Sequence, residues 1–484
     1  MSTILAIGTG PIFEPDVKVF NGQALRTWHI IRALAANGRS VDALILPVEG
    51  SQPDQPGGPF YLPGNRDGVD FQKVNSVDRT EMAVEFQKLV DSGIYNAMVA
   101  INLNAAAVVC QLETRLPMWV DLCGYTMGEA QAKCGVYQDD SYLRHFWARE
   151  RLALRRGDRF SCVSFKQMYA NLAELAVLGR LSQFNFSHPF CTVIPIAASE
   201  EFLNPANYPN ERRYRGKLFP TDAFVIIWSG GFNTWTDARS LAGALSLAME
   251  QEPRIHFVAT GGAIPGHDEI TYETFKSEML KTGYLDRCHL LDWVEAQEIF
   301  ALYREGDLGI NIDSLNYETV FGARNRLTNM MAAGLPVLTT LGTEISEIID
   351  ENKLGYVVRI GRVNDYADAL IRAAKNPAER RAFATRARKF VAENFSYEAT
   401  TRSLIAWADN PQIAPDNVEK LRKFPDLKRF QDVALNSLEE DALLAEQTTH
   451  SEVANLRAEL ERVEAELAGI RSNPLYKAYK KVVK

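Results

Sequence analysis

The sequence predicts an α/β protein made of two parallel-sheet domains, followed by a helical C-terminal region. Three observations support this prediction. The chain has 484 residues, which is too long for one hydrophobic core. Short apolar runs alternate with stretches of helical periodicity in both halves, a pattern typical of parallel strands joined by helices. An apolar heptad repeat near the C-terminus indicates one further helix.

Composition excludes several classes of protein. Apolar content of 46% and charged content of 24% are those of an ordinary soluble globular protein. A net charge of −8 argues against nucleic acid as the main partner. The N-terminus has no basic region before its apolar run, and no window of about 18 residues is uninterruptedly apolar, so neither a signal peptide nor a membrane span is expected. The six cysteines include no Cys-x-x-Cys pair, which indicates buried thiols in a reducing cytoplasm.

The first domain is expected over residues 1–205. A strand at 3–7, a helix at 24–37 and a strand at 41–46 form a Rossmann-like start. The glycine pair in this first loop is a weak dinucleotide fingerprint, because Phe13 stands where a third glycine is needed. Nicotinamide binding is therefore not expected.

Two further features of the first domain bear on function. Residues 49–68 are rich in Pro and Gly and predict an irregular surface loop, which either covers a binding site or is a simple connector. A strand at 118–122 ends around Asp121, where open parallel sheets place functional groups. A lone Asp at a strand end also commonly caps a helix, so both roles are open.

The second domain is expected over residues 206–395. The apolar run 223–228 has the composition of a parallel strand buried on both faces, and Gly230 and Gly231 follow it. The strand at 255–259 is likewise followed by Gly261 and Gly262. Glycine lets a backbone approach a ligand where side chains would collide, although a tight turn is the alternative explanation. Two such loops in one domain favour a ligand-facing sheet edge.

The stretch 316–340 carries the strongest signal. A polar loop holds Glu318, Arg324 and Arg326, and it leads into a helix that ends at Gly334 before a short buried strand. A helix start supplies unpaired N–H groups and about half a positive charge, and each arginine adds a planar set of donors. This arrangement is suited to an anion.

The same stretch resembles the donor-binding segment of retaining glycosyltransferases of the GT-B fold, family 4. The resemblance rests on Gly-Leu-Pro-Val closing an Ala-rich helix after an acidic loop. That family usually carries two glutamates eight residues apart, and here Phe321 and Asn329 occupy those positions. Glu318 followed by Arg324-Asn-Arg-Leu resembles a divergent branch with an Arg-x-Arg-Leu helix start.

The resemblance implies the GT-B fold, with two Rossmann-like domains facing a cleft, an acceptor-binding first domain and a donor-binding second domain. It also implies a helix at 396–410 that crosses back to the first domain. The catalytic residues implied or hypothesised are Glu318, Arg324 and Asp121. The donor-binding residues are Gly22, Gly230, Gly231, Asn233, Gly261, Gly262, Trp293, Val294, Arg326, Asn325 and Asn329.

A diphosphate needs a cation, because two helix starts offset only about one of its charges. The family supplies an Arg and a Lys just after the first glycine loop, but here no cation precedes Arg239. Arg324 and Arg326 are therefore hypothesised to replace the missing pair, the alternative being a surface pair with Glu318. No metal is predicted, because the chain has no suitable Asp-x-Asp loop and its seven histidines do not cluster. No cofactor besides the donor is expected.

The C-terminal region is predicted in three parts: a linker at 411–436, a coiled coil at 437–472 and a basic amphipathic tail at 473–484. The coiled-coil helix either seeks a partner or lies on the enzyme, and its narrow apolar seam favours a homo-oligomer. The tail is suited to an anionic membrane surface, or it is merely solvated.

The expected function is a cytoplasmic, metal-independent, retaining glycosyltransferase, peripheral at the inner face of the membrane. It would move a hexosyl or related group from a nucleotide-diphosphate sugar to a glycan or lipid-linked acceptor in envelope polysaccharide synthesis. Two alternatives are a nucleotide-sugar epimerase of the same fold and a non-catalytic scaffold acting through its coiled coil. Incubation with labelled nucleotide sugars would separate the three. Slow hydrolysis of the donor marks a transferase, conversion of the sugar marks an epimerase, and no binding marks a scaffold.

Overall fold

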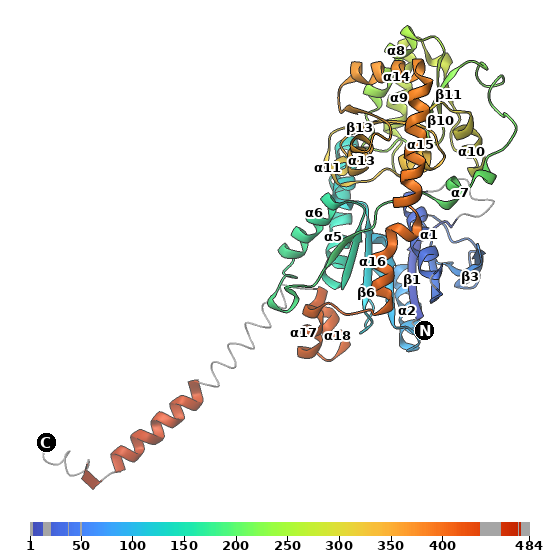
Figure 1. The fold of residues 1–484 in the computed structure, drawn as a ribbon. Helices are drawn as coiled ribbons and strands as arrows, with labels where there is room; N and C mark the ends of the chain where they lie inside the picture. Colours follow the sequence, from blue (N-terminus) through green and yellow to red (C-terminus); the bar gives the residue numbers. More distant parts are fainter. Residues whose placement is uncertain are drawn as a thin grey trace. The chain divides into compact units, whose positions relative to one another are not determined.

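The computed structural model describes residues 3–12, 21–36, 38–48, 51–435, 456–472 and 474–475. The chain divides into two units, residues 1–419 and 420–484. The first unit contains one eight-stranded and one six-stranded sheet, drawn in blue to green and in green to orange in Figure 1. This is the predicted α/β architecture with two sheets.

The first sheet has the order β3-β4-β2-β1-β5-β6-β7-β8, and all its pairs are parallel except β3 with β4. Its strands are β1 (Thr3–Thr9), β2 (Ser40–Leu46), β3 (Tyr61–Arg66), β4 (Val69–Val74), β5 (Ala97–Ile101), β6 (Met118–Cys123), β7 (Arg159–Cys162) and β8 (Cys191–Val193). The Pro/Gly-rich loop was expected to reach residue 68, but it gives way to β3 at Tyr61, because pairing with β4 orders this stretch.

Helices cover both faces of the first sheet. They are α1 (Gly22–Ala36), α2 (Arg79–Asp91), α3 (Leu103–Val109), α4 (Thr126–Tyr137), α5 (Ser141–Arg156) and α6 (Phe165–Val177). Residues of α2, α3, α5 and α6 share one apolar core with the strands. Those of α1 share the other with α16 (Tyr397–Asp409), whose Trp407 lies 5.4 Å from Trp119 between ring centroids. The chain thus returns to the first domain after building the second.

The second sheet has the order β11-β10-β9-β12-β13-β14, and all its strands are parallel. They are β9 (Phe224–Trp228), β10 (Ile255–Ala259), β11 (Cys288–Leu290), β12 (Leu308–Asn311), β13 (Val337–Leu341) and β14 (Tyr356–Arg359). All five residues of β9 are buried, as its continuous apolar sequence predicts. The strand order reverses between β9 and β12, so the loops after these strands lie at a topological switch point, where α/β proteins bind ligands.

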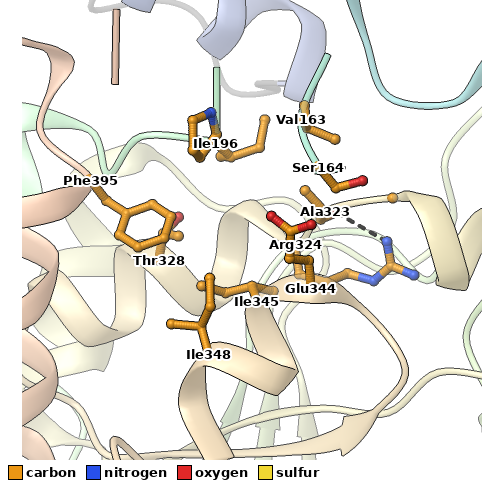
Figure 2. Close-up of a pocket in the computed structure, with 12 residues that line it drawn as sticks. Val163, Ser164, Ile196, Ala323, Arg324, Thr328, Glu344, Ile345, Ile348 and Phe395 are labelled. Atoms are coloured by element: carbon orange, nitrogen blue, oxygen red, sulfur yellow. Dashed lines mark hydrogen bonds between the residues drawn. The ribbon is translucent and has the colours of Figure 1, made fainter. Parts of the chain in front are cut away.

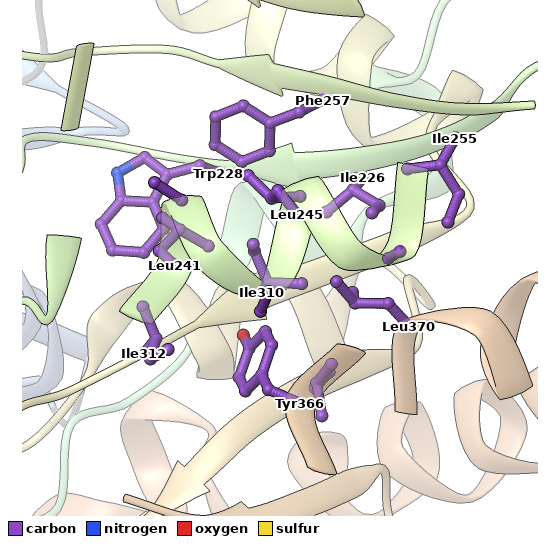
Figure 3. Packing of buried hydrophobic residues seen from close by; sticks show 14 of the residues in the cluster. Ile226, Trp228, Leu241, Leu245, Ile255, Phe257, Ile310, Ile312, Tyr366 and Leu370 are labelled. Carbon is purple, nitrogen blue, oxygen red and sulfur yellow. The ribbon is translucent and has the colours of Figure 1, made fainter. Parts of the chain in front are cut away.

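Helices also cover both faces of the second sheet. They are α8 (Ala238–Gln251), α9 (Ile270–Thr282), α10 (Ala296–Glu305), α11 (Tyr317–Phe321), α12 (Asn325–Ala332), α13 (Glu344–Glu351), α14 (Val363–Lys375) and α15 (Pro377–Asn394). Figure 3 shows Ile226 and Trp228 of β9 packed with Leu241 of α8 and Tyr366 of α14. The opposite face buries residues of α10, α12, α13 and α15.

Short helices complete the connections. They are α7 (Glu200–Leu203) and the 3-10 turns Gln183–Asn185, Pro205–Asn207 and Leu285–Arg287. The segment around α7 carries the chain from β8 in the first sheet to β9 in the second.

Residues 411–436, expected as a linker, contain two helices instead, α17 (Pro415–Lys423) and α18 (Leu427–Leu435). Proline fits the first turn of a helix, so Pro415 starts α17 rather than preventing it. Arg180 Nε donates to Asp416 Oδ2 at 2.5 Å, and Asn417 Nδ2 donates to Asp158 Oδ1 at 2.8 Å. These buried polar contacts fix the start of α17 within the first unit.

In the second unit, a small core joins Phe424, Phe430, Val433 and Ala434. Residues 456–472 are helical, within the region predicted as a coiled coil. The rest of that prediction, at 437–455, and the tail at 476–484 lie outside the described residues. Among the helices the structure describes, none combines the length and apolarity needed to cross a membrane.

His29 supplies a pH-dependent contact between α1 and α16. Its Nε2 lies 2.8 Å from Thr400 Oγ1, and its ring stacks on Tyr397. Burial lowers the pKa of His29 well below its usual value, and the charge of Arg26 lowers it further. The folded protein therefore holds His29 neutral.

We predict that acid weakens the fold through His29. The unfolded chain binds this proton below about pH 6.5 and the folded chain does not, so stability is full above that pH and falls below it. The His29→Gln variant should lose up to about 1.4 kcal/mol per pH unit of this dependence. Urea unfolding between pH 8 and 5 measures it, and equal slopes in both proteins would contradict the assignment.

Candidate active site

The two glycine pairs lie side by side at the carboxyl ends of β9 and β10. Gly231 pairs with Gly262, and Phe232 N donates to Gly262 O at 2.9 Å. A Cβ on Gly261 would lie 2.4 Å from the carbonyl carbon of Gly230, and Gly261 has a φ of +90°. Glycine is therefore required here by backbone packing of one loop on the other, in addition to any approach of a ligand.

Arg326 lies against the first glycine loop. Its guanidinium stands 4.0 Å above the Trp228 ring, and Nη2 donates to Gly231 O at 2.8 Å. Nη1 is buried and has no hydrogen-bond partner among the residues that the structure describes. Burial lowers the pKa of Arg326 to about 10. Within the described part of the chain no carboxylate forms an ion pair with this cation.

Arg324 is in a different situation. Its Nε donates to Asp313 Oδ1 at 2.9 Å, and Nη1 and Nη2 donate to the Glu318 carboxylate at 2.9 and 2.7 Å. Burial lowers the pKa of Arg324, but these two carboxylates outweigh it and raise the pKa overall. The expectation that Arg324 supplies a free cation is thus corrected, because two acidic groups already neutralise it. The alternative of a pair with Glu318 holds, except that the pair is buried.

Glu318 is held in place by the same pairing. Asn316 caps the short helix α11 by accepting from Thr319 N at 2.8 Å, which turns Glu318 inward. Both carboxylate oxygens contact Arg324. Burial raises the pKa of Glu318, and Arg324 opposes this rise. A sugar hydroxyl would therefore have to share this carboxylate with Arg324.

The first domain meets this region through α4. A Cβ on Gly128 would lie 2.9 Å from Glu318 N, so only glycine allows α4 to approach α11 this closely. The next residue, Glu129, is partly buried. Desolvation raises its pKa to about 7, and the charge of Glu318 adds to the rise. Lys133, one turn further, has its Nζ 3.5 Å from Gly266 O and stands above the Tyr142 ring.

Glu129 and Lys133 were not predicted from the sequence. The available signal was a Glu and a Lys four residues apart, on a helix that follows the buried strand β6. Such pairs are common on solvated helices, so the spacing alone does not separate a functional site from a surface pair.

Asp121, proposed as catalytic, has a structural role. It is fully buried, and both oxygens accept from Arg26, at 2.7 and 2.9 Å. Ser161 Oγ also donates to it at 2.6 Å, and Arg26 Nη1 reaches Pro195 O at 3.1 Å. The pair joins β6, α1 and the segment leaving the first domain. These contacts use its acceptor positions within the core and favour the structural role, and the catalytic role of Asp121 stays an untested prediction.

Three predicted donor-binding residues lie at the domain boundary. A Cβ on Gly22 would lie 3.0 Å from Asn325 Nδ2, so Gly22 and Asn325 approach each other across it. Asn329 Oδ1 accepts from Ser199 N at 3.0 Å, between α12 and the connecting segment. The amide oxygen of Asn329 thus holds the domain connection, and donor binding by this residue stays a prediction.

The remaining predicted donor-binding residues surround the glycine loops. The half-buried Asn233 follows the first loop, and its carbonyl accepts from Thr236 N at 2.8 Å. Trp293 Nε1 donates to Ala263 O at 2.9 Å, which places Trp293 and the following Val294 beside the second loop. The structure thus brings these residues to the glycine loops that Arg326 contacts.

A small cavity of about 30 Å³ lies between the two domains, and Arg324 is one of the residues that line it. Figure 2 shows Ile345, Ile348 and Phe395 gathered along one side of it. Near it the domains are tied by Ser164 Oγ, which donates to Phe321 O at 2.7 Å.

Among the residues that the structure describes, no three His, Cys, Asp or Glu side chains gather as a metal-binding group. Metal independence stays a prediction.

Part of this chain is similar in sequence to a known family, and its fold is similar to solved structures. A family model described as glycosyl transferases group 1 matches residues 223–376. No curated protein matches the chain.

Three solved structures share the two-domain fold. Sucrose-phosphate synthase from Thermosynechococcus elongatus has a TM-score of 0.58 at 17% identity, over 84% of this chain and 97% of its own. HepE (Alr3699) from Anabaena, in complex with UDP and glucose, has a TM-score of 0.60 at 14% identity, over 84% and 100%. WaaG, a glycosyltransferase involved in lipopolysaccharide biosynthesis, has a TM-score of 0.56 at 18% identity, over 85% and 99%. The chain therefore carries a group 1 glycosyltransferase domain, at residues 223–376, within the GT-B fold.

Proposed function

We propose that this protein transfers a glycosyl group from a nucleotide-diphosphate sugar, and that Arg326 binds the diphosphate. The observation that carries the proposal is Arg326 Nη1, which is buried beside the first glycine loop and has no hydrogen-bond partner within the described part of the chain. A buried cation without an anion loses several kcal/mol of hydration that a bound phosphate would restore. HepE, which shares the fold, was solved with UDP and glucose.

Two further features favour an anion at this place. The start of α12 has no side-chain cap, so its first N–H groups keep their capacity to donate. Gly230 also has a φ of +88°, and its missing Cβ leaves the backbone near Arg326 accessible. A helix start and a guanidinium together supply more than one positive charge toward a group that carries about two negative charges.

The reaction breaks the bond between the anomeric carbon and the diphosphate oxygen and forms one between that carbon and an acceptor hydroxyl. Arg326 stabilises the negative charge that develops on the leaving group. The acceptor proton passes to the diphosphate or to Glu129, whose pKa near 7 suits proton exchange at neutral pH. Following the family resemblance, we propose retention of configuration, hexosyl or related transfer and independence of metal.

For the acceptor, we propose a glycan or a lipid-linked saccharide of envelope polysaccharide synthesis. WaaG, a relative by fold, acts in lipopolysaccharide biosynthesis. The C-terminal sequence ends in four lysines interleaved with apolar residues, which suits a peripheral contact with the anionic inner face of the membrane.

The two rival functions make different use of the same site. A scaffold with a decayed site has no need for a buried, unpaired guanidinium at the glycine loops. An epimerase has no need for an acceptor, whereas α4 of the first domain brings Glu129 and Lys133 to the second domain. Both observations favour a transferase.

We predict that Arg326→Gln weakens binding of nucleoside diphosphates about 10- to 150-fold, because it removes a charge-assisted hydrogen bond of about 1.5–3 kcal/mol. Calorimetric titration with UDP, GDP and ADP identifies the base and measures the loss. Arg239→Gln is the matched control, because Arg239 is exposed at the start of α8. Equal affinity in the Arg326 variant would remove the proposed role.

Arg324→Gln should act differently, through the stability of the fold. It leaves Asp313 and Glu318 buried without their partner, which we expect to destabilise the protein by about 3–5 kcal/mol. Thermal unfolding of both arginine variants tests this contrast. A stable Arg324 variant that loses only nucleotide affinity would reverse the assignment of the two arginines.

The pH dependence of transfer should report Glu129. If its carboxylate takes the acceptor proton, kcat/KM rises with pH through about 7 as Glu129 ionises. In Glu129→Gln that rising limb should disappear and the rate at pH 8 should fall about 100-fold or more. If kcat/KM of the Glu129→Gln variant still rises through about pH 7, the leaving diphosphate takes the acceptor proton instead.

A further inference from the structure

The helix at residues 456–472 exposes a continuous apolar stripe. Leu456, Leu460, Val463, Leu467 and Ile470 are each between 41% and 65% exposed. Their spacing alternates between four and three residues, which keeps them on one side of the helix. An isolated helix of this length is only marginally stable in water, so the helix needs a partner that covers its apolar stripe.

The heptad positions follow from the stripe. Leu460 and Leu467 occupy position a, and Leu456, Val463 and Ile470 occupy position d. The charged residues that flank the stripe are Glu459 and Glu466 at position g, and Arg457, Glu464 and Arg471 at position e. In a coiled coil these flanking residues select the direction of the partner helix.

A parallel partner in register satisfies this pattern best. It stacks all five apolar layers and places Glu466 of each chain opposite Arg471 of the other, although Glu459 then faces Glu464.

Antiparallel partners fit less well. Either antiparallel register pairs only four of the five described apolar residues. One register places Glu464 opposite its own copy and Arg457 opposite Arg471, and these like-charge contacts oppose association. The other register sets a repulsive Glu459–Glu466 contact against an attractive Arg457–Glu464 contact, so its charges balance as in the parallel pair and the lost apolar layer disfavours it.

We propose that residues 456–472 bind the same helix of a second copy of this chain as a parallel, in-register coiled coil. A second copy of this chain is the partner because its stripe matches all five apolar layers. In addition, Glu466 of each copy then lies opposite Arg471 of the other. Pairing raises the effective concentration of one chain near its partner's substrates. This inference does not depend on the proposed glycosyl transfer.

Sedimentation equilibrium of the full chain tests the association. The intact protein should show a mass above 54.2 kDa that grows with concentration toward twice that value or more. Leu460→Glu with Leu467→Glu should weaken association more than 100-fold and leave a monomer, because four charges would enter the seam. The matched control places the same charges on the outer face, as Ala458→Glu with Ala465→Glu, and should associate like the intact protein.

The proposal is overturned if the intact protein is a monomer. It is also overturned if the double variant Leu460→Glu with Leu467→Glu, the seam variant, associates as strongly as the intact protein. Nucleotide affinity should be the same in the seam variant as in the intact protein, so failure of the coiled coil and failure of the proposed function remain distinguishable.

A charge reversal tests the orientation. In the parallel pair, Glu464→Arg turns the repulsive contact with Glu459 into an attractive one, so the dissociation constant should fall on the order of fivefold. In the antiparallel registers the new arginine meets its own copy or Arg457, and the affinity stays equal or falls. Glu461→Arg makes the same change at position b, away from the partner, and is the control. A Glu464→Arg variant that binds no tighter than this control overturns the parallel arrangement.

Discussion

The buried ionic group of Arg324, Asp313 and Glu318 fixes the centre of this protein. Asp313 follows β12, Glu318 lies on α11, and Arg324 stands directly before α12, so one guanidinium joins three consecutive pieces of chain. Two carboxylates around one cation are tolerated out of water only when each hydrogen bond is made. This requirement holds the loop in one conformation, and it directs the next charged residue, Arg326, toward the glycine loops.

The boundary between the domains is built on the same principle. Asp121 with Arg26, Asn329 with Ser199, and Ser164 with Phe321 all use buried polar groups to join segments that are distant in sequence. Each of these groups would destabilise the fold if left unpaired, so each specifies one relative placement of the elements it joins. The polar side chains nearest the boundary therefore serve the architecture more than the chemistry.

The chemistry that we propose rests on two groups with perturbed surroundings. Arg326 keeps a buried donor with no partner among the described residues, and Glu129 is held where desolvation and the charge of Glu318 raise its pKa to about 7. The two come from different domains, one cationic at the glycine loops and one acidic on α4. Strongly perturbed groups of opposite character at a domain interface are the signature of a site prepared for a charged ligand.

The sequence by itself determined the two mainly parallel sheets and the paired glycine loops, because these follow from local periodicity, and it led to the hypothesis of an arginine before Gly334 as the cation. Only the tertiary structure distinguished Arg324 from Arg326, since Arg326 meets Gly231, 95 residues away in sequence, whereas Arg324 is held by Asp313 and Glu318. It likewise gave Asp121 and Asn329 partners in the architecture, pointed to Glu129, and turned the expected linker into α17 and α18. Hydrogen-bond partners and desolvation are set by neighbours in space, and sequence spacing carries no record of them.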